Sequence, residues 1–245
     1  MHAFARCASV AIFATAFLLA ACGSQEVDTI AQSASGGAST AQTGDWQVLF
    51  DGDDLDHWRG FKRDDVPAGW QIQDGVLAFV PGEDGGDLVT REQYENFELE
   101  LEWRISEGGN SGIFYRVSED SQYGRTYDTG PEMQILDDDS HADGLTEKHR
   151  TGSNYALHAP AVDAVNPVGE WNSVRIVADG AHVEHWLNGE KVVEYEQWSD
   201  EWQQLVEASK FVDFPGYGQY REGHIALQDH GDPVWFRNIR IRQLP

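Results

Sequence analysis

Cysteine is nearly absent from this chain of 245 residues, and its two cysteines, Cys7 and Cys22, both lie close to the N-terminus. The rest of the chain therefore carries neither a disulfide nor thiol chemistry. Basic residues are also scarce, with 17 Lys plus Arg against 42 Asp plus Glu and a formal net charge of −25. A nucleic-acid-binding protein needs a basic stripe, and the sequence has none. The acidic balance suits solubility, cation binding or a saline habitat.

Long apolar runs are missing as well. The apolar run at 8–21 is shorter than the roughly 20 residues that a membrane-spanning helix needs. It follows Arg6 and ends in L-A-A-C-G (19–23), which resembles a bacterial lipobox. That resemblance implies cleavage before Cys22 and attachment of a lipid to this cysteine, and the alternative is a plain secretory signal.

These features predict three parts. Residues 1–21 are a lipoprotein signal peptide, and residues 22–44 are the lipidated Cys22 followed by a flexible tether rich in Ser, Ala, Gly, Gln and Thr. Such a tether reaches roughly 25 Å. Residues 45–245 are one folded domain. We expect a bacterial cell-envelope protein, anchored to a membrane through Cys22 at the outer membrane or facing the periplasm. No protein partner is implied.

The pattern of the domain is that of β-structure. Residues 97–105 alternate between apolar and charged side chains, which predicts an antiparallel strand with one wet face. X-Gly turns at 74–75, 179–180 and 188–189 join pairs of short strands. One short helix is predicted after the N-cap Ser199. The sequence thus predicts an all-β, two-sheet sandwich or jelly roll with a single short helix.

The segment at 130–139, G-P-E-M-Q-I-L-D-D-D, has strand periodicity with an unusual polar face. Two of its residues, Met133 and Ile135, point towards a core, which leaves Glu132 and Gln134 together on the other face. Three aspartates (137–139) and a histidine (141) follow at once. A surface strand needs only solubility on its outer face, so a carboxylate and an amide on a rigid sheet indicate a site.

Two other strands carry polar residues that can meet this pair on one curved sheet. Arg116 shares a face with Phe114, and a second strand places His224, Gln228 and His230 on one face. Together they suit sugar hydroxyls and proton transfer. The alternatives are an ion pair of Arg116 with Glu132 and an ordinary surface role for His224. Three aromatic residues are candidates for stacking on sugar rings: Tyr115, Trp186 and Tyr217.

Five strings, spread in order over the domain, resemble the 3-keto-disaccharide hydrolase domain family. They are G-N-S-G-I-F-Y-R (109–116), G-P-E-M-Q-I-L-D-D (130–138), G-E-W-N-S-V-R-I-V (169–177), V-E-H-W-L-N-G (183–189) and H-I-A-L-Q-D-H-G-D-P-V-W-F-R-N-I (224–239). The resemblance spans roughly residues 45–245. It implies a concanavalin A-like sandwich that is secreted or lipid-anchored and acts on glycosides whose sugar is oxidised at C3.

A ketone at C3 makes the C2 proton acidic, so a base can remove it, the enolate can expel the C1 substituent, and water can add back. The outcome is hydrolysis, or a lyase reaction if water does not add. The candidate base is His141 or His230, and Glu132 is the alternative acid. Arg116, or a divalent cation (Ca²⁺ or Mn²⁺) held by Asp137 and Glu132, stabilises the enolate. The aspartate run at 137–139 is otherwise a turn. Five further residues are expected to bind the carbohydrate substrate: Asn110, Tyr115, Gln134, His224 and Gln228.

Two other functions fit the same residues. An ordinary two-carboxylate glycosidase could use Glu132 and Asp137 on either side of the scissile bond. A non-catalytic carbohydrate-binding module would use the sandwich and its aromatic platforms without turnover.

Overall fold

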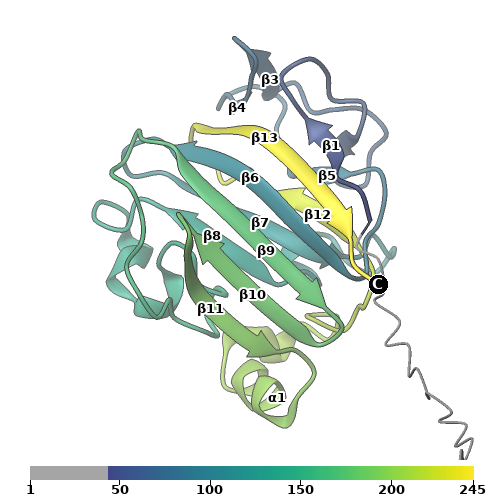
Figure 1. Ribbon diagram of the computed structural model, residues 1–245, viewed down its shortest axis with the longest axis vertical. Helices are drawn as coiled ribbons and strands as arrows, with labels where there is room; N and C mark the ends of the chain where they lie inside the picture. The colour runs from purple at the N-terminus through teal and green to yellow at the C-terminus, as the bar shows by residue number, and fades with distance from the viewer. Residues whose placement is uncertain (1–43) are drawn as a thin grey trace, which may run out of the picture. The chain divides into compact units, whose positions relative to one another are not determined.

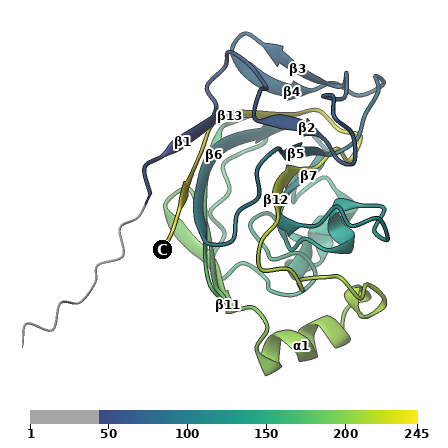
Figure 2. The same ribbon diagram turned by 90° about the vertical axis from the view of Figure 1, so that its right-hand side faces the viewer.

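The computed structural model describes residues 44–245, which form two antiparallel sheets packed face to face (Figures 1 and 2). In spatial order, the larger sheet contains β11 (Glu190–Glu196), β10 (His182–Leu187), β9 (Asn172–Asp179), β6 (Phe97–Ile105), β13 (Val234–Gln243), β4 (Val76–Phe79) and β3 (Trp70–Gln73), with β1 (Gln47–Phe50) paired to β13. The smaller sheet contains β2 (Trp58–Gly60), β5 (Leu88–Thr90), β12 (His224–Leu227), β7 (Asn110–Val117) and β8 (Glu132–Leu136). The predicted all-β sandwich is confirmed.

Within residues 44–245, helical structure is confined to short pieces in the connections. The one α-helix of this part is α1 (Asp200–Glu207), and its N-cap Ser199 accepts a hydrogen bond from the Trp202 N–H at 3.1 Å. The 3-10 turns are η1 (Thr126–Asp128), η2 (Ala142–Leu145), η3 (Glu147–His149) and η4 (Lys210–Asp213). In Figure 2, turns between β7 and β9 lie on the side of the smaller sheet that faces away from the larger one. No helix within residues 44–245 is long and apolar enough to cross a membrane.

Strand β6 shows why the larger sheet forms as the sequence predicts. Its apolar residues are at most 2 % exposed and fill the space between the sheets, as alternation requires. Its outward glutamates lie opposite arginines of β13, and Arg240 Nε donates to Glu100 Oε2 at 2.8 Å. Similar cross-strand pairs join Glu102 to Arg237 and Glu98 to Arg242. The charged face is therefore a ladder of ion pairs between neighbouring strands.

The predicted hairpin turns fix the register of the small strands. Both residues of Asp74-Gly75 and of Asn188-Gly189 have positive φ, the conformation of a type I′ turn. They join β3 to β4 and β10 to β11. Since a shift of one residue would exchange the two faces, these turns also decide which side chains enter the core.

The smaller sheet has apolar residues on both faces. A second apolar cluster of Val89, Phe114, Val117 and Ala226 is separate from the main core, and Phe61 and Tyr127 pack against it. Because Ile113 and Leu227 belong to the main core, the alternating Phe114 and Ala226 must lie on the outward face. The outward face of the smaller sheet thus carries a buried apolar patch.

The predicted signal peptide (1–21) and the predicted Cys22 anchor and tether (22–44) lie outside the described residues, apart from Gly44 at the boundary.

Candidate active site

The floor of the candidate site is a row of three residues on neighbouring strands. Gly112 on β7 lies opposite Gln134 on β8, and the Gln228 N–H beyond β12 donates to the Gly112 carbonyl at 3.0 Å. All three lie on the outward face of the smaller sheet. A Cβ at position 112 would overlap Glu132 Oε1, so the Glu132 carboxyl lies across the space that this glycine leaves open. The two amides therefore flank a carboxyl group.

Glu132 is an acid kept away from water. The residue is 6 % exposed, beside the outward apolar patch. Burial raises the pKa of Glu132 to about 8, the charge of Lys210 opposes that rise, and the Asp87 and Asp143 carboxyls add to it. Burial therefore favours the protonated form of this carboxyl, which can donate a proton.

Lys210 brings a positive charge to the same place. It is the first residue of η4, and its ammonium lies 4.2 Å from the centre of the Tyr155 ring. Tyr155 is fixed at both ends, because its N–H donates to the Glu132 carbonyl at 3.0 Å and its hydroxyl donates to Asp143 Oδ2 at 3.0 Å. Burial lowers the pKa of Lys210, while the Glu132 and Asp143 carboxyls oppose that change.

Two histidines lie at the other side of the site. The rings of His141 and His230 are 6.2 Å apart and nearly perpendicular. Nδ1 of His141 accepts the Asp143 N–H at 3.1 Å, so the neutral ring carries its proton on Nε2 and is a donor. His230 is exposed and extends from the loop after β12.

Apart from His141, these titratable groups line one pocket of about 320 Å³, at the small end of the range for ligand sites. The structure brings together five residues that the sequence predicted: Asn110, Glu132, Gln134, Gln228 and His230. His141 stands beside His230. Gln228 Oε1 is buried with no hydrogen-bond partner among the described residues.

Sequence reasoning missed the other side of the pocket, which is lined by Arg125, Tyr127, Asp143, Tyr155, Lys210 and Phe214. These residues come from η1, η2, η4 and the loops beside them, where no strand period indicates which way a side chain points. Only Asp143, two residues after His141, had a local signal.

Arg116 does not lie in the pocket, which corrects the expectation that it faces the trough beside Glu132. Its φ of +55° and the register shift between β12 and β7 rotate the end of the strand. The side chain is 1 % exposed, and its guanidinium donates to Gln197 Oε1 at 2.6 Å and to the Gly180 carbonyl at 2.7 Å. Arg116 therefore joins the two sheets.

Three other predicted sugar contacts also lie elsewhere. The Tyr115 hydroxyl is in the core, 3.0 Å from His185 Nε2, and Tyr217 is a buried ring stacked on Phe211. Trp186 lies in a groove on the outer face of the larger sheet, with the Arg175 guanidinium over its ring. Each belongs to packing away from the pocket.

His224 is a structural residue. It is 3 % exposed, and its Nδ1 donates to the Thr90 carbonyl at 2.7 Å while Gln93 Nε2 donates to its Nε2 at 3.1 Å. With both ring nitrogens engaged, it connects β12 to β5 and does not face the pocket.

Asp137 forms a turn and is not arranged as a cation ligand. Its Oδ2 accepts the Gly108 N–H at 2.7 Å, and its Oδ1 accepts the N–H groups of Asp139 and Ser140. It lines a different groove from that of Glu132. The residues present therefore do not fit a cation held jointly by Asp137 and Glu132.

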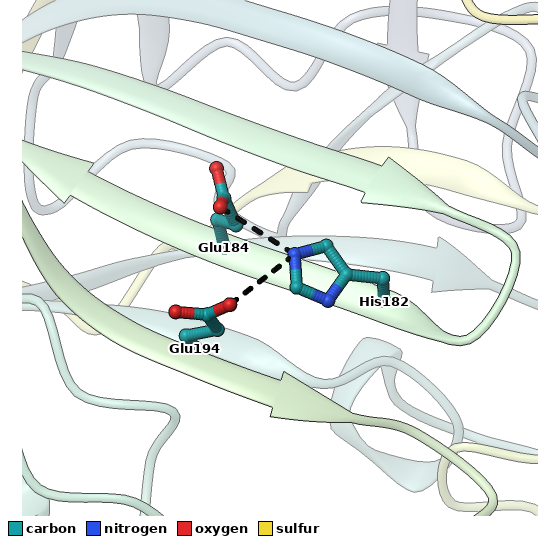
Figure 3. Close-up of side chains that lie close together, drawn as sticks. All are labelled: His182, Glu184 and Glu194. Atoms are coloured by element: carbon teal, nitrogen blue, oxygen red, sulfur yellow. Dashed lines mark hydrogen bonds and ion pairs between the residues drawn. The ribbon is translucent and has the colours of Figure 1, made fainter.

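One group within residues 44–245 has the spacing of metal ligands, namely His182, Glu184 and Glu194 on the β10–β11 hairpin (Figure 3). His182 Nε2 lies 3.4 Å from Glu184 and 3.6 Å from Glu194. Lys191 Nζ already lies 3.1 Å from Glu184, and it also pairs with Glu194. The group is a surface ion-pair network that shares no residue with the pocket.

The pocket combines a buried carboxyl with a raised pKa, an imidazole, an ammonium and three side-chain amides. Such a set can move protons and stabilise a developing negative charge. The fold and the pocket define the class: a jelly-roll sandwich with a pocket of titratable and amide side chains on the outward face of its smaller sheet.

Comparison with known proteins identifies the family. The profile of the 3-keto-alpha-glucoside-1,2-lyase-like domain family matches residues 45–242. A 3-keto-disaccharide hydrolase of Bacteroides thetaiotaomicron is 39 % identical over 226 residues, which cover 80 % of this chain and 78 % of that protein. The chain belongs to this family, and the resemblance noted in the sequence is confirmed.

Solved structures agree with the fold. A candidate glycosyl hydrolase from Parabacteroides distasonis superposes with a TM-score of 0.76 at 38 % identity, covering 82 % of this chain and 94 % of that one. A galectin-like protein of unknown function from Bacillus subtilis, at 14 % identity, superposes with a TM-score of 0.53 over 82 % of this chain and 96 % of that one. At that identity the second match speaks for the sandwich alone.

Proposed function

We propose that this protein cleaves glycosides whose sugar carries a ketone at C3. One observation carries the proposal: the buried Glu132 carboxyl, with its pKa raised to about 8, shares a sugar-sized pocket with Lys210 and His230. The relative named 3-keto-disaccharide hydrolase supports the substrate class.

The reaction follows from the acidity of C2. His230 takes the C2 proton, and the electron pair of that bond forms an enolate with the C3 oxygen. Lys210 and the side-chain amides of the pocket stabilise the negative oxygen. The enolate re-forms the ketone and expels the C1 oxygen, which receives a proton from Glu132. Water then adds its hydroxyl to C1 and gives its proton to the Glu132 carboxylate, while His230 returns a proton to C2. This completes hydrolysis and restores both side chains, and release before this step gives a lyase product.

His230 suits the role of base better than His141. The Nδ1 lone pair of His141 already accepts the Asp143 N–H, so this ring offers its Nε2 proton as a hydrogen-bond donor. Donation to a substrate hydroxyl or to the C3 oxygen fits that state. No group within residues 44–245 hydrogen-bonds the His230 ring, whose lone pair is thus free for a proton.

The two-carboxylate glycosidase finds less support. That mechanism needs two acids facing one bond, and Asp137, the expected partner of Glu132, has its oxygens occupied by backbone N–H groups outside the pocket. The other carboxyl that lines the pocket, Asp143, accepts the Tyr155 hydroxyl through its Oδ2.

The test is to incubate the protein with 3-keto-trehalose and, in parallel, with unoxidised trehalose, in D₂O with and without chelator. We expect cleavage of the oxidised sugar alone, deuterium at C2 of the product, and no effect of chelator. Cleavage of trehalose itself would support the two-carboxylate route. Saturable binding without any product would leave a carbohydrate-binding module.

The cellular location is a separate proposal that comes from the sequence alone. We expect a lipid on Cys22 and a place in the bacterial cell envelope. Metabolic labelling with an alkyne fatty acid tests this: the native chain should be labelled and should partition into detergent. Cys22→Ser should lose both properties, and equal labelling of that variant would contradict the anchor.

A further inference from the structure

Two aspartates outside the pocket lining hold the segment that carries His230. Asp87 precedes β5, and Asp229 stands directly before His230. Asp87 Oδ1 accepts the Asp229 N–H at 2.9 Å. In return, Asp229 Oδ2 accepts the Gly86 N–H at 2.7 Å, and its Oδ1 accepts the Gly231 N–H at 2.9 Å. Each loop thus supplies a carboxylate to the backbone of the other.

The packing around this pair leaves it little freedom. A Cβ at position 85 would overlap Asp229 Oδ2, so the loops approach each other closely at a glycine. The hydroxyl of Thr126 on η1 donates to Asp87 Oδ2, which ties the pair to the wall of the pocket. Burial raises the pKa of Asp87 to about 6, as expected for an enclosed carboxyl.

The His230 side chain has no such support of its own. No group within residues 44–245 hydrogen-bonds its ring, and its nearest aromatic neighbour is His141, with ring centres 6.2 Å apart. The location of the imidazole therefore depends on the backbone at 229–231, which is what the two carboxylates hold.

We propose, on the basis of the role given to His230 above, that Asp87 and Asp229 form a positioning clamp that aims this imidazole at C2 of the substrate. Neither aspartate touches the substrate. Both act through the peptide segment that bears the base. A displacement of about 1 Å at a reacting group can lower a rate on the order of 100-fold, so holding this backbone matters for catalysis.

Substitution by Asn should preserve the hydrogen bonds of one aspartate but not those of the other. Asp87 faces one N–H and one hydroxyl, and Asn can accept from the first and donate to the second. Asp229 faces two backbone N–H groups, and Asn has a single acceptor oxygen. Asp87→Asn should therefore keep most of the activity, whereas Asp87→Ala and Asp229→Asn should lose it.

The experiment measures kcat and KM on a 3-keto-glycoside for these three variants, alone and combined with His230→Ala, together with each Tm. Asp87→Ala alone should lower kcat by about 10- to 100-fold with little change in KM. In the His230→Ala background the same change should cost little more, because the base it positions is gone and only the effect of the Asp87 charge on Glu132 remains. Asp54→Ala is the matched control, since Asp54 accepts a backbone N–H from Asp56 in an exposed loop.

The outcomes separate the clamp from the proposed function. Full activity of His230→Ala would overturn the role of His230 and the proposed mechanism. An inactive His230→Ala beside a fully active Asp87→Ala would overturn the clamp alone. An equal loss from Asp87→Ala with and without His230, or an equal loss in Asp87→Asn and Asp229→Asn, would make the aspartates merely structural.

Discussion

A single missing side chain creates the floor of this pocket. Gly112 has an ordinary strand conformation, so a glycine is not required here for its backbone freedom. Its role is to leave room for the Glu132 carboxyl, which a Cβ at this position would overlap. Strand periodicity predicted the outward faces of Glu132 and Gln134, as well as those of Gln228 and His230. It did not predict this role of Gly112, because the overlap arises between two strands and depends on how one side chain crosses the other.

We expect Gly112→Ala to displace the Glu132 carboxyl and to lower kcat by about 100-fold, the contribution typical of a general acid. The control is Gly124→Ala, because a Cβ at position 124 would have no close neighbour and its φ is negative. Steady-state kinetics on a 3-keto-glycoside, with circular dichroism to check folding, make the comparison. Equal activity of the two variants would show that the carboxyl does not need this space.

Glu132 should also make the free energy of unfolding depend on pH. The pKa of its carboxyl is about 8 in the folded protein and lower in the unfolded chain. Between these values the folded state binds more protons, so the stability from the neutral carboxyl is complete at low pH and is lost as pH rises towards 8. Urea unfolding from pH 5 to 9 should show this decline, by up to a few kcal/mol, and Glu132→Gln should lack it. A parallel decline in the variant would contradict the assignment.

At the scale of elements, β7 shows where counting along a strand succeeds and where it fails. Alternation places Asn110 in the pocket lining, Gly112 beside the Glu132 carboxyl, and Tyr115 in the core, where a substrate cannot reach it. It fails at Arg116, because a bulge against β12 and a positive φ turn the strand end. A bulge of this kind has no sequence signal in Tyr-Arg-Val. Lys210 and Tyr155 reach the pocket from turns and loops. These segments have no strand period, so the sequence did not indicate the direction of either side chain.

Arg116 should therefore matter for folding and not for chemistry. Arg116→Ala leaves Gln197 Oε1 and the Gly180 carbonyl without a buried donor, at a cost of about 1–3 kcal/mol each. We expect a clearly lower Tm and an unchanged kcat for the folded fraction. Arg63→Ala is the control, because its pairs with Asp65 and Asp84 are exposed and should contribute little. A loss of kcat at full stability would return Arg116 to the mechanism.

At the scale of the whole molecule, the sequence predicted the architecture but not the strand order. The hairpin turns predicted that β3 pairs with β4, β9 with β10 and β10 with β11, because each pair is joined by a short turn. The pairing of β6 with β13 joins segments far apart in the chain, and nothing local indicates it. The pairing of β6 with β13 depends both on the packing of the core and on the ion pairs between their glutamates and arginines. The family resemblance supplied the fold where single elements could not.

The acidic net charge of the chain should make its thermal stability depend on salt. The chain carries 42 acidic against 17 basic residues, and several of the basic ones are already held in pairs on the larger sheet. The remaining carboxylates repel one another in the compact state. Salt at 0.1 M screens charges beyond about 10 Å, which weakens this long-range repulsion more than the close, paired contacts. The Tm should therefore rise between low salt and 0.5 M NaCl at pH 7.

The control for that measurement is pH 4.5, near the sequence pI of about 4.4, where the net charge is small and added NaCl should hardly change the Tm. If the Tm at pH 7 fell with salt instead, the paired contacts of the β6–β13 ladder would outweigh the repulsion. The local ion pairs of the acidic surface would then stabilise the fold by more than its net negative charge destabilises it.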